Sequence, residues 1–401
     1  MTVAIVAGSD AGHAFPALGL ATAFLAAGDR PIVYTGERWI PVAAERGIEV
    51  RPLPGLAARP GEDDDDAGAK LSVRAARMAL ELAPELALTG VDLVVSDVIT
   101  IAGGWAAELV GVPWIELSPH PLYEQSSGLP PIGAGLAAGE GFRGRLRDTV
   151  LRSSSAPAVA KGRRQRRRAR ASIGLPAEPS PIARFVATLP GLEVPRPDWP
   201  ARTHLVGPLL FEPTAECFDR PAGDGPLIVV APSTAATGAG DLGAEALSAL
   251  AELQARRPVR VVFSALQPPN AAEAPRGLVA ATARQDELLP DADLVICGAG
   301  HGMLAKTLLA GVPVVTVPGG GDQWELASRV QRIGCGLLVR PATAEALAAA
   351  VVEVLDDDRY ASAARRVADT VAGVVDPVAT AHRAYAREAA AGQSWRMDSC
   401  V

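Results

Sequence analysis

The chain has 401 residues, of which 49% are hydrophobic and 21% charged, and its formal net charge is −7 at pH 7. This composition excludes a disordered chain and supplies enough apolar side chains for two cores, because one domain commonly holds about 100–200 residues. The acidic balance argues against a general nucleic-acid-binding protein.

Neither a disulfide scaffold nor a metal site is indicated by the cysteines and histidines. The four cysteines form no CxxC pair, and the five histidines form no HExxH motif. The first residues, MTVAIVAGSDAGH, lack the basic segment of a signal peptide, and no apolar stretch predicts a helix that spans a bilayer. We therefore expect a cytoplasmic protein.

The first half of the chain repeats a strand–helix–strand pattern. Residues 2–7 are a continuous apolar run, which predicts a strand buried on both faces of a parallel sheet. A Gly-rich turn from Gly8 to His13 follows, and residues 14–27 have the spacing of a helix that stops at Gly28. Further strands are predicted over residues 31–34, 47–53, 91–96 and 114–117, and helices over 71–86 and 101–110.

The second half repeats the pattern. Strands are predicted over residues 227–231, 259–264, 294–297 and 314–317, and helices over 243–256, 304–310 and 344–355. The fold class is therefore α/β, with two doubly wound parallel-sheet (Rossmann-like) domains, residues 1–211 and 227–376, joined by a linker over 212–226. The Pro- and Gly-rich residues 119–141 are expected to form a long functional loop.

Two side chains at the expected carboxyl edge of the first sheet are candidates for acid–base chemistry. His13 follows the first strand, where a neutral imidazole can act as a general base. Asp97 ends the buried run VDLVVSD and can fix the tautomer of a histidine. Each residue can instead cap a helix, a role that aspartate favours.

Two Gly-rich turns follow strands of the second half. GAGHG at 298–302 lets backbone N–H groups and a helix N-terminus approach a phosphate. PGGGDQ at 318–323 offers Asp322 and Gln323 as partners for sugar hydroxyls. Either turn, taken alone, can also be an ordinary turn before a helix.

Together these segments resemble a known family over essentially the whole chain. The opening GHAFPALGLATAFLAAGD, the segment DLVVSDVITIAGGWAAELVGVPWI and the stretch LLPDADLVICGAGHGMLAKTLLAGVPVVTVPGGGDQ are similar to a GT-B glycosyltransferase of family one. This superfamily comprises the UDP-glycosyltransferases and the bacterial antibiotic glycosyltransferases. The pairing of GVP at 311–313 with DQ at 322–323 is the most specific part of the resemblance.

The resemblance implies an inverting, metal-independent transfer of a sugar from a UDP- or dTDP-sugar to a hydroxyl of a small lipophilic acceptor, without a cofactor. It implies that His13 deprotonates the acceptor and that Asp97 is the carboxylate partner of His13. It implies donor contacts by Ser233, Thr234, Gln285, Gly298, Ala299, Gly300, His301, Gly302, Asp322 and Gln323. It places Trp105, His120 and Tyr123 by the acceptor, although His120 can also be a loop histidine without a role. It places a last helix over 377–391 against the N-terminal domain, in a monomer or homodimer.

Three positions depart from the family pattern. Gly298 stands where a histidine usually contacts the diphosphate, Lys306 where a glutamate binds the ribose, and Thr282 where an aromatic side chain stacks on the base. We expect His301, the backbone amides of the turn and Lys306 to hold the phosphates; the alternative is that Lys306 points to solvent. Loss of the ribose-binding glutamate makes dTDP-sugars as suitable as UDP-sugars.

A basic run, KGRRQRRRAR at 161–170, contains seven cationic side chains. Such a run is commonly a solvated helix face, and a peripheral contact with an anionic inner-membrane surface is the alternative. Two other functions remain open: a sugar-nucleotide-binding pseudoenzyme, and a MurG-like transferase that acts on a lipid-linked acceptor. An oxidoreductase is disfavoured because GSDAGH lacks GxGxxG. The DQ segment disfavours an epimerase.

Overall fold

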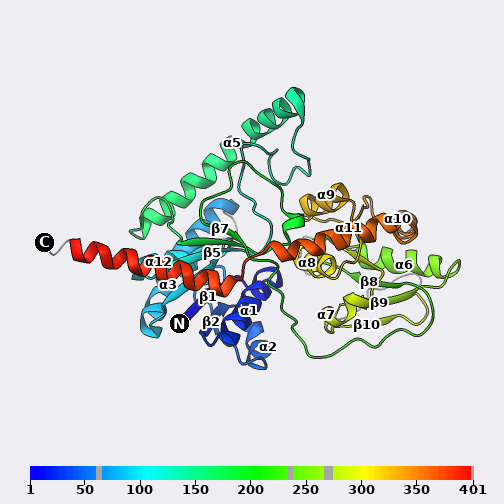
Figure 1. Cartoon of the computed structure of the whole chain (residues 1–401), viewed down its shortest axis with the longest axis horizontal. Helices are drawn as coiled ribbons and strands as arrows, with labels where there is room; N and C mark the ends of the chain where they lie inside the picture. The colour runs from blue at the N-terminus through cyan, green and yellow to red at the C-terminus, as the bar shows by residue number, and fades with distance from the viewer. Residues whose placement is uncertain (60–65, 234–237, 266–273, 399–401) are drawn as a thin grey trace.

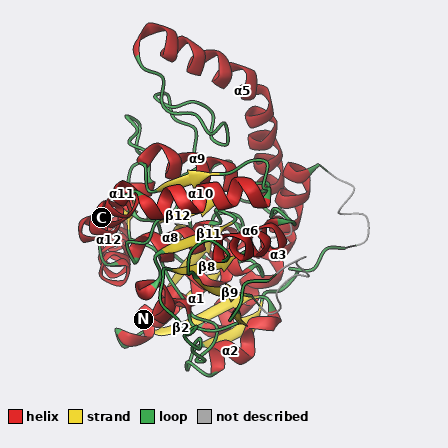
Figure 2. Cartoon of the chain, turned by 90° about the vertical axis from the view of Figure 1, so that its right-hand side faces the viewer, coloured by secondary structure: helices red, strands yellow, loops and turns green. Residues whose placement is uncertain are grey.

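Two parallel β-sheets, each covered by helices on both faces, make up the chain (Figure 1 and Figure 2). The computed structural model describes residues 1–59, 66–233, 238–265 and 274–398. Thr234, one of the predicted donor contacts, lies outside the described residues. The two-sheet α/β architecture predicted from the sequence is confirmed.

Seven strands form the first sheet, in the order β3-β2-β1-β4-β5-β6-β7. They are β1 (Thr2–Val6), β2 (Arg30–Thr35), β3 (Glu49–Pro52), β4 (Leu93–Asp97), β5 (Trp114–Ser118), β6 (Ala183–Val186) and β7 (Thr203–Leu205). The central strands consist almost wholly of buried residues, as expected where helices cover both faces. The register pairs Val6 with Ser96, so the segments that follow β1 and β4 leave the sheet side by side.

Alternate residues of β1 contribute to two cores on opposite faces of this sheet. Val3 and Ile5 pack with helix α1 (Ala11–Ala26), next to α2 (Ile40–Ala44) and the 3₁₀ turn η1 (Glu37–Trp39). Ala4 and Val6 pack with α3 (Ala67–Thr89) and α4 (Ala102–Val110). The long helix α5 (Gly141–Ser172) contacts α3, and one end of α5 projects from the molecule (Figure 1).

Six strands form the second sheet, in the order β10-β9-β8-β11-β12-β13. They are β8 (Leu227–Ala231), β9 (Arg260–Ser264), β10 (Val279–Ala281), β11 (Leu294–Cys297), β12 (Val314–Thr316) and β13 (Gly336–Leu338). One face is covered by α6 (Leu242–Gln254) and α10 (Ala344–Asp356). The other face is covered by α8 (His301–Leu309), α9 (Gln323–Ile333) and α11 (Asp358–Asp369). Short turns of helix, α7 (Gln285–Leu288) and η4 (Leu289–Asp291), precede β11.

Two connections join the halves. Residues 206–226 contain no helix or strand, and the last helix, α12 (Pro377–Asp398), follows the 3₁₀ turn η5 (Thr370–Gly373) and returns to the first half. Val378 and Ala381 of α12 enter the core beside α1. His382 Nε2 lies 2.7 Å from Asp29 Oδ2, just after α1. The exact domain boundaries stay a prediction.

Several short elements did not emerge from the sequence patterns. Strands β6, β7, β10 and β13 have three or four residues each, which is too few to show a periodic pattern of hydrophobic residues. A 3₁₀ turn after β6, η3 (Pro190–Leu192), was not predicted either. Leu189 and Leu192, in and beside η3, pack into the core of the second half and so connect the two domains.

Candidate active site

His13 and Asp97 meet at the carboxyl edge of the first sheet. Helix α1 begins at Ala11, so His13 lies in its first turn and not in the preceding loop as the sequence suggested. Asp97 is the last residue of β4, the strand next to β1. His13 Nδ1 lies 2.7 Å from Asp97 Oδ2. The His13 side chain is 24% exposed and that of Asp97 only 1%, so the ring faces outward from a buried carboxylate.

Backbone groups hold the Asp97 carboxylate in place. Its Oδ1 accepts hydrogen bonds from the N–H groups of Ile99 at 2.8 Å and Thr100 at 3.0 Å, which leaves Oδ2 for His13. With Nδ1–H donating to this carboxylate, Nε2 is the nitrogen that can accept a proton. A His–Asp pair of this geometry suits general-base chemistry.

The pKa of His13 results from opposing effects. Burial of the ring lowers it, but the hydrogen bond to Asp97 and the negative charges of Asp97, Asp10 and Asp322 outweigh burial and raise the pKa above its ordinary value. Asp322 belongs to the second half of the chain, so a carboxylate of one domain acts on the histidine of the other. A raised pKa makes His13 a stronger base once deprotonated.

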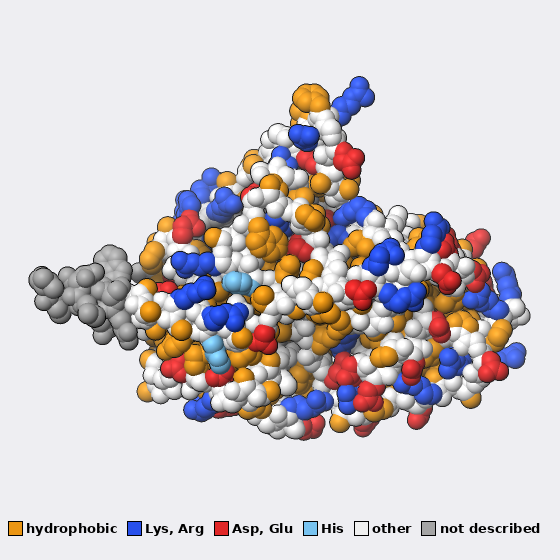
Figure 3. Space-filling model, viewed as in Figure 1, with side chains coloured by type: hydrophobic (Ala, Val, Ile, Leu, Met, Phe, Trp, Pro, Cys, Tyr) orange, Lys and Arg blue, Asp and Glu red, His pale blue; other side chains and the backbone are white. Residues whose placement is uncertain are grey.

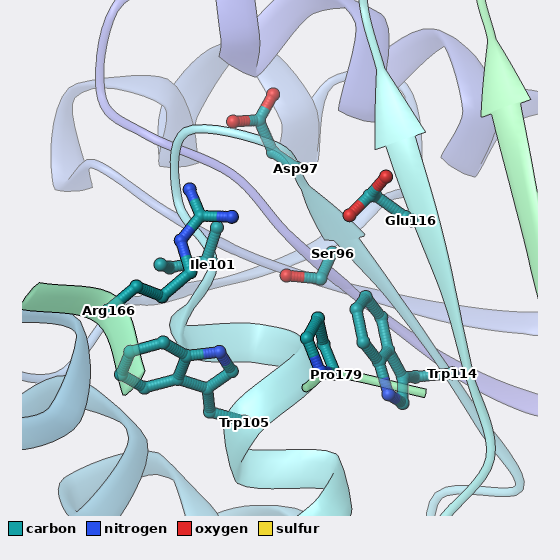
Figure 4. A pocket seen from close by; sticks show the side chains of 8 residues that line it. All are labelled: Ser96, Asp97, Ile101, Trp105, Trp114, Glu116, Arg166 and Pro179. Carbon is teal, nitrogen blue, oxygen red and sulfur yellow. The ribbon is translucent and has the colours of Figure 1, made fainter. Parts of the chain in front are cut away.

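Figure 4 shows a small pocket behind Asp97. Its lining residues are Ser96, Asp97, Ile101, Trp105, Trp114, Glu116, Arg166 and Pro179. Trp105, a predicted acceptor contact, is only 1% exposed, and the guanidinium of Arg170 lies 5.4 Å from its ring centroid. Trp105 is therefore part of the buried floor near Asp97 and offers almost no surface to an acceptor.

The other two predicted acceptor residues lie together. The rings of His120 and Tyr123 stack with centroids 4.3 Å apart. His120 Nδ1 lies 2.8 Å from the carbonyl oxygen of Pro121, and burial lowers the pKa of this histidine. Tyr123 Oη donates to Asp322 Oδ2 at 3.1 Å, which brings the Pro- and Gly-rich loop into contact with the second half.

The predicted donor residues follow three neighbouring strands of the second sheet. Ser233 follows β8, the GAGHG turn follows β11, and Asp322 and Gln323 follow β12. Gln323 Nε2 donates to Ser233 Oγ at 2.9 Å, and its Oε1 accepts from the Gly319 N–H at 2.8 Å. The structure therefore brings these segments to one edge, where parallel α/β sheets bind ligands.

The structure gives a steric reason for glycine at position 298. A Cβ atom built on Gly298 would lie 3.0 Å from the Cβ of Ser233, so a larger side chain needs Ser233 to move. Ala299 has a φ of 59°, and Gly300 precedes the first residue of α8. His301 and Gly302 then open the helix, whose N-terminus presents free N–H groups and positive potential.

His301 is oriented toward the first half of the chain. Its Nε2 lies 2.9 Å from Thr188 Oγ1. Burial, together with the charge of His120, lowers the pKa of His301 to about 3. The ring is therefore neutral near pH 7 and supplies no positive charge to a phosphate. His301 is nevertheless the first residue of α8, and its contact with the sugar nucleotide stays a prediction.

The alternative that Lys306 points to solvent is wrong, and its contact with a phosphate stays a prediction. Lys306 Nζ donates to Glu212 Oε1 at 2.5 Å and to Gln285 Oε1 at 3.1 Å. The Lys306 and Glu212 side chains are 10% and 9% exposed, so the ammonium lies out of solvent and is paired with a carboxylate. Gln285, the predicted nucleoside contact, also donates from Nε2 to Ser264 Oγ at 2.8 Å. Thr282, the third departure, is exposed.

Sequence reasoning missed a buried ionic cluster that joins the halves. Arg329 Nε donates to Glu325 Oε1 at 3.1 Å within α9, and its Nη1 lies 3.7 Å from Glu193 Oε1 in the first half. Glu325 Oε2 also accepts from the N–H groups of Gly133 at 3.2 Å and Gly135 at 2.9 Å in the Pro- and Gly-rich loop. No local pattern could reveal this cluster, because its members come from three separate segments.

Two features are absent among the described residues. Among them, no three or more His, Cys, Asp or Glu side chains are grouped so as to hold a metal ion. None of the described helices combines the length and the apolar character needed to cross a membrane.

The chain is similar to known proteins in sequence and in fold. The EryCIII-like family (erythromycin biosynthesis protein CIII-like, C-terminal domain) matches residues 244–386. The chain is 30% identical over 311 residues, 72% of each chain, to 4'-demethylrebeccamycin synthase of Lentzea aerocolonigenes. Among solved structures, the glycotransferase of kitacinnamycin matches with a TM-score of 0.73 at 21% identity, over 96% of this chain and 98% of that chain. The glycosyltransferase VinC in complex with dTDP matches with a TM-score of 0.69 at 19% identity, over 96% of this chain and 100% of that one.

The sequence relative covers more than two thirds of this chain, and the structural neighbours share its two-sheet fold. The chain belongs to the GT-B glycosyltransferases of family one, the superfamily that includes the bacterial antibiotic glycosyltransferases.

Proposed function

We propose that this glycosyltransferase transfers a sugar from a UDP- or dTDP-sugar to a hydroxyl group of a small lipophilic acceptor, with inversion and with His13 as the general base. The observation that carries the proposal is the His13–Asp97 hydrogen bond of 2.7 Å at the carboxyl edge of the first sheet. The charge of Asp322, beside the start of α9, contributes to the raised pKa of this histidine. The base and a donor-side carboxylate therefore belong to one electrostatic site.

In the proposed reaction, His13 Nε2 takes the proton of the acceptor hydroxyl as its oxygen attacks the anomeric carbon. Asp97 stabilises the imidazolium that forms. The bond to the nucleoside diphosphate breaks in the same displacement, which inverts the configuration. The N–H groups and positive potential at the start of α8 favour the diphosphate as it leaves, so that the transfer needs no metal ion.

The comparisons support the substrate classes. The sequence relative is named as the synthase of a small molecule, 4'-demethylrebeccamycin, and the VinC neighbour was solved with dTDP. The stacked rings of His120 and Tyr123 offer an apolar surface to a lipophilic acceptor, beside Asp322. We propose that Asp322 and Gln323 bind hydroxyl groups of the donor sugar.

The test measures nucleoside diphosphate release from UDP- and dTDP-sugars with a panel of hydroxylated aromatic acceptors. The wild-type protein should convert an α-linked donor into a β-linked product, which NMR coupling constants identify, and a chelator should leave the rate unchanged. His13→Ala should lower turnover about 10²–10⁴-fold while calorimetric binding of the nucleotide stays within about twofold.

The chain offers a matched control for this substitution. His382 also pairs with an aspartate, Asp29, at 2.7 Å, but at the contact between α12 and the end of α1. His382→Ala should therefore retain full turnover. Turnover of His13→Ala within threefold of wild type refutes the base assignment. If the wild-type protein binds no nucleotide at millimolar concentration, the proposed enzymatic function is refuted, and a protein that no longer binds a donor is favoured.

A further inference from the structure

Helix α5 extends well beyond the body of the protein. It has 32 residues, Gly141–Ser172, and its C-terminal part lies against α3, where Lys161 Nζ and Asp66 Oδ2 are 3.0 Å apart. Its N-terminal part projects away from both sheets in two perpendicular views (Figure 1 and Figure 2). The end of the projection carries hydrophobic and basic side chains (Figure 3).

An apolar stripe runs along the projecting part. Phe142 is 81% exposed, Leu146 50% and Val150 59%. These residues are spaced by four, so they lie on one side of the helix. A large aromatic and two aliphatic side chains are thus held in solvent on the projecting part of the helix.

The same helix carries many basic side chains, and two of them lie on the side of the apolar stripe, further along the helix. The helix has eleven basic residues and one acidic residue, a net charge of +10, whereas the whole chain has −7, so the remaining residues together carry −17. At 100° per residue, Arg164 and Arg168 fall within about 80° of Phe142 around the helix axis, as Leu146 and Val150 do. Within the part of the chain that the structure describes, neither Arg164 nor Arg168 forms an ion pair, and both are exposed.

We propose that this side of α5, made by Phe142, Leu146, Val150, Arg164 and Arg168, is a docking surface for an anionic lipid bilayer. A helix with an apolar side and arginines lies in the interface of such a membrane, with its apolar side chains among the acyl chains and its cations at the phosphates. Nucleic acid offers the same phosphates but no place for the exposed apolar stripe. The acidic remainder of the chain is repelled by the surface, which orients the protein with α5 toward the lipid.

The experiment is sedimentation of the full-length protein with vesicles of phosphatidylcholine alone, or with 30% phosphatidylglycerol. Wild type should bind the anionic vesicles at low ionic strength and leave them at 0.5 M salt. Each arginine near an anionic surface contributes about fivefold to partitioning, so Arg164→Gln with Arg168→Gln should weaken binding about 30-fold. Phe142→Ser with Leu146→Ser and Val150→Ser should weaken it at least tenfold at the same salt concentration.

Matched substitutions on other surfaces distinguish binding through this side of α5 from nonspecific adsorption to the vesicles. Leu88 is 89% exposed at the end of α3, so Leu88→Ser is the apolar control. Arg256 and Arg276 are exposed, so Arg256→Gln with Arg276→Gln is the charge control. Both controls should bind vesicles like wild type, and all variants should keep the wild-type far-UV circular dichroism.

Three results overturn the proposal. The first is no binding of wild type to anionic vesicles at low salt. The second is binding that the triple serine variant retains in full, because the apolar stripe then makes no contact. The third is binding of a duplex oligonucleotide in preference to the vesicles, which would assign the arginines to nucleic acid.

Discussion

The hydroxyl of Tyr123 donates a hydrogen bond to Asp322 across the two halves of the chain, at 3.1 Å and over a separation of 199 residues. Burial, and then the charge of Asp322, raise the pKa of Tyr123 well above its ordinary value, so the hydroxyl remains a donor at all physiological pH values. If Asp322 binds a hydroxyl of the donor sugar, Tyr123 competes with that hydroxyl for the carboxylate.

Tyr123→Phe should therefore tighten the binding of a nucleotide sugar. The substitution removes the competing hydroxyl and keeps the ring that stacks on His120. A hydrogen bond is typically worth about 0.5–1.5 kcal/mol net, so the dissociation constant for the complete donor should fall about threefold to tenfold. The affinity for the nucleoside diphosphate without a sugar should not change. Calorimetric titration of both ligands measures the difference.

The control is Tyr360→Phe, because the Tyr360 hydroxyl also donates to a carboxylate, that of Glu353, at 2.7 Å on an exposed surface. It should leave both affinities unchanged. An equal gain for the donor and the free nucleotide in Tyr123→Phe would show that the hydroxyl does not compete with the sugar.

The pH dependence of transfer should report the His13–Asp97 pair. A general base acts when deprotonated, so kcat/KM should rise with pH and level off above the raised pKa of His13. Asp97→Asn removes the charge that favours the protonated ring, so the inflection should move to lower pH. The plateau should fall about 10²-fold or more, because the amide cannot stabilise the imidazolium.

An Asp29→Asn variant serves as the comparison, since Asp29 pairs with His382 away from the site. Its pH profile should match that of wild type. An inflection in Asp97→Asn at the wild-type pH would mean that another group controls the rate.

Breaking the Lys306–Glu212 pair should cost stability. Both side chains are about nine-tenths buried, and removal of one partner leaves the other charge without compensation. Lys306→Met should therefore destabilise the protein by about 3–5 kcal/mol, and Lys306→Met with Glu212→Gln should recover part of that loss. Urea unfolding, followed by fluorescence, measures the midpoints.

Arg359 and Asp357 form an exposed pair at 2.5 Å, and Arg359→Met should change the midpoint little. If the double variant were less stable than Lys306→Met alone, the buried pair would not be the cause.

His301 should make the stability of the protein sensitive to acid. Its pKa is about 3 in the folded protein, below the ordinary value of 6.5, so the unfolded chain binds a proton more readily. The titration of His301 therefore leaves the free energy of unfolding at its full value above about pH 6.5. It lowers that free energy as the pH falls from 6.5 toward 3. His301→Gln, which cannot be protonated, should lose less stability between pH 6.5 and pH 4 than wild type does. If the free energy of unfolding fell equally with pH for the two proteins over this range, the pKa of His301 would not be lowered by folding.

Much of the fold and part of the site follow from local patterns. The apolar run at residues 2–7 and the Gly-rich turn after it predict a buried parallel strand that leads into a helix. The buried run ending at Asp97 predicts a second such strand. Since the carboxyl ends of parallel strands meet at one edge, the approach of His13 to Asp97 could be anticipated, and the 2.7 Å contact agrees with it.

Only the tertiary structure shows which side chains from distant segments contact one another. Lys306 meets Glu212, 94 residues earlier, although neither the helix around the lysine nor the linker around the glutamate contains a signal for the other. Trp105 is buried although its position suggested an acceptor contact, and Phe142 is exposed although it is a large aromatic residue. Sequence periodicity specifies which side of an element is apolar, but the packing of elements decides which sides are covered and which charges meet.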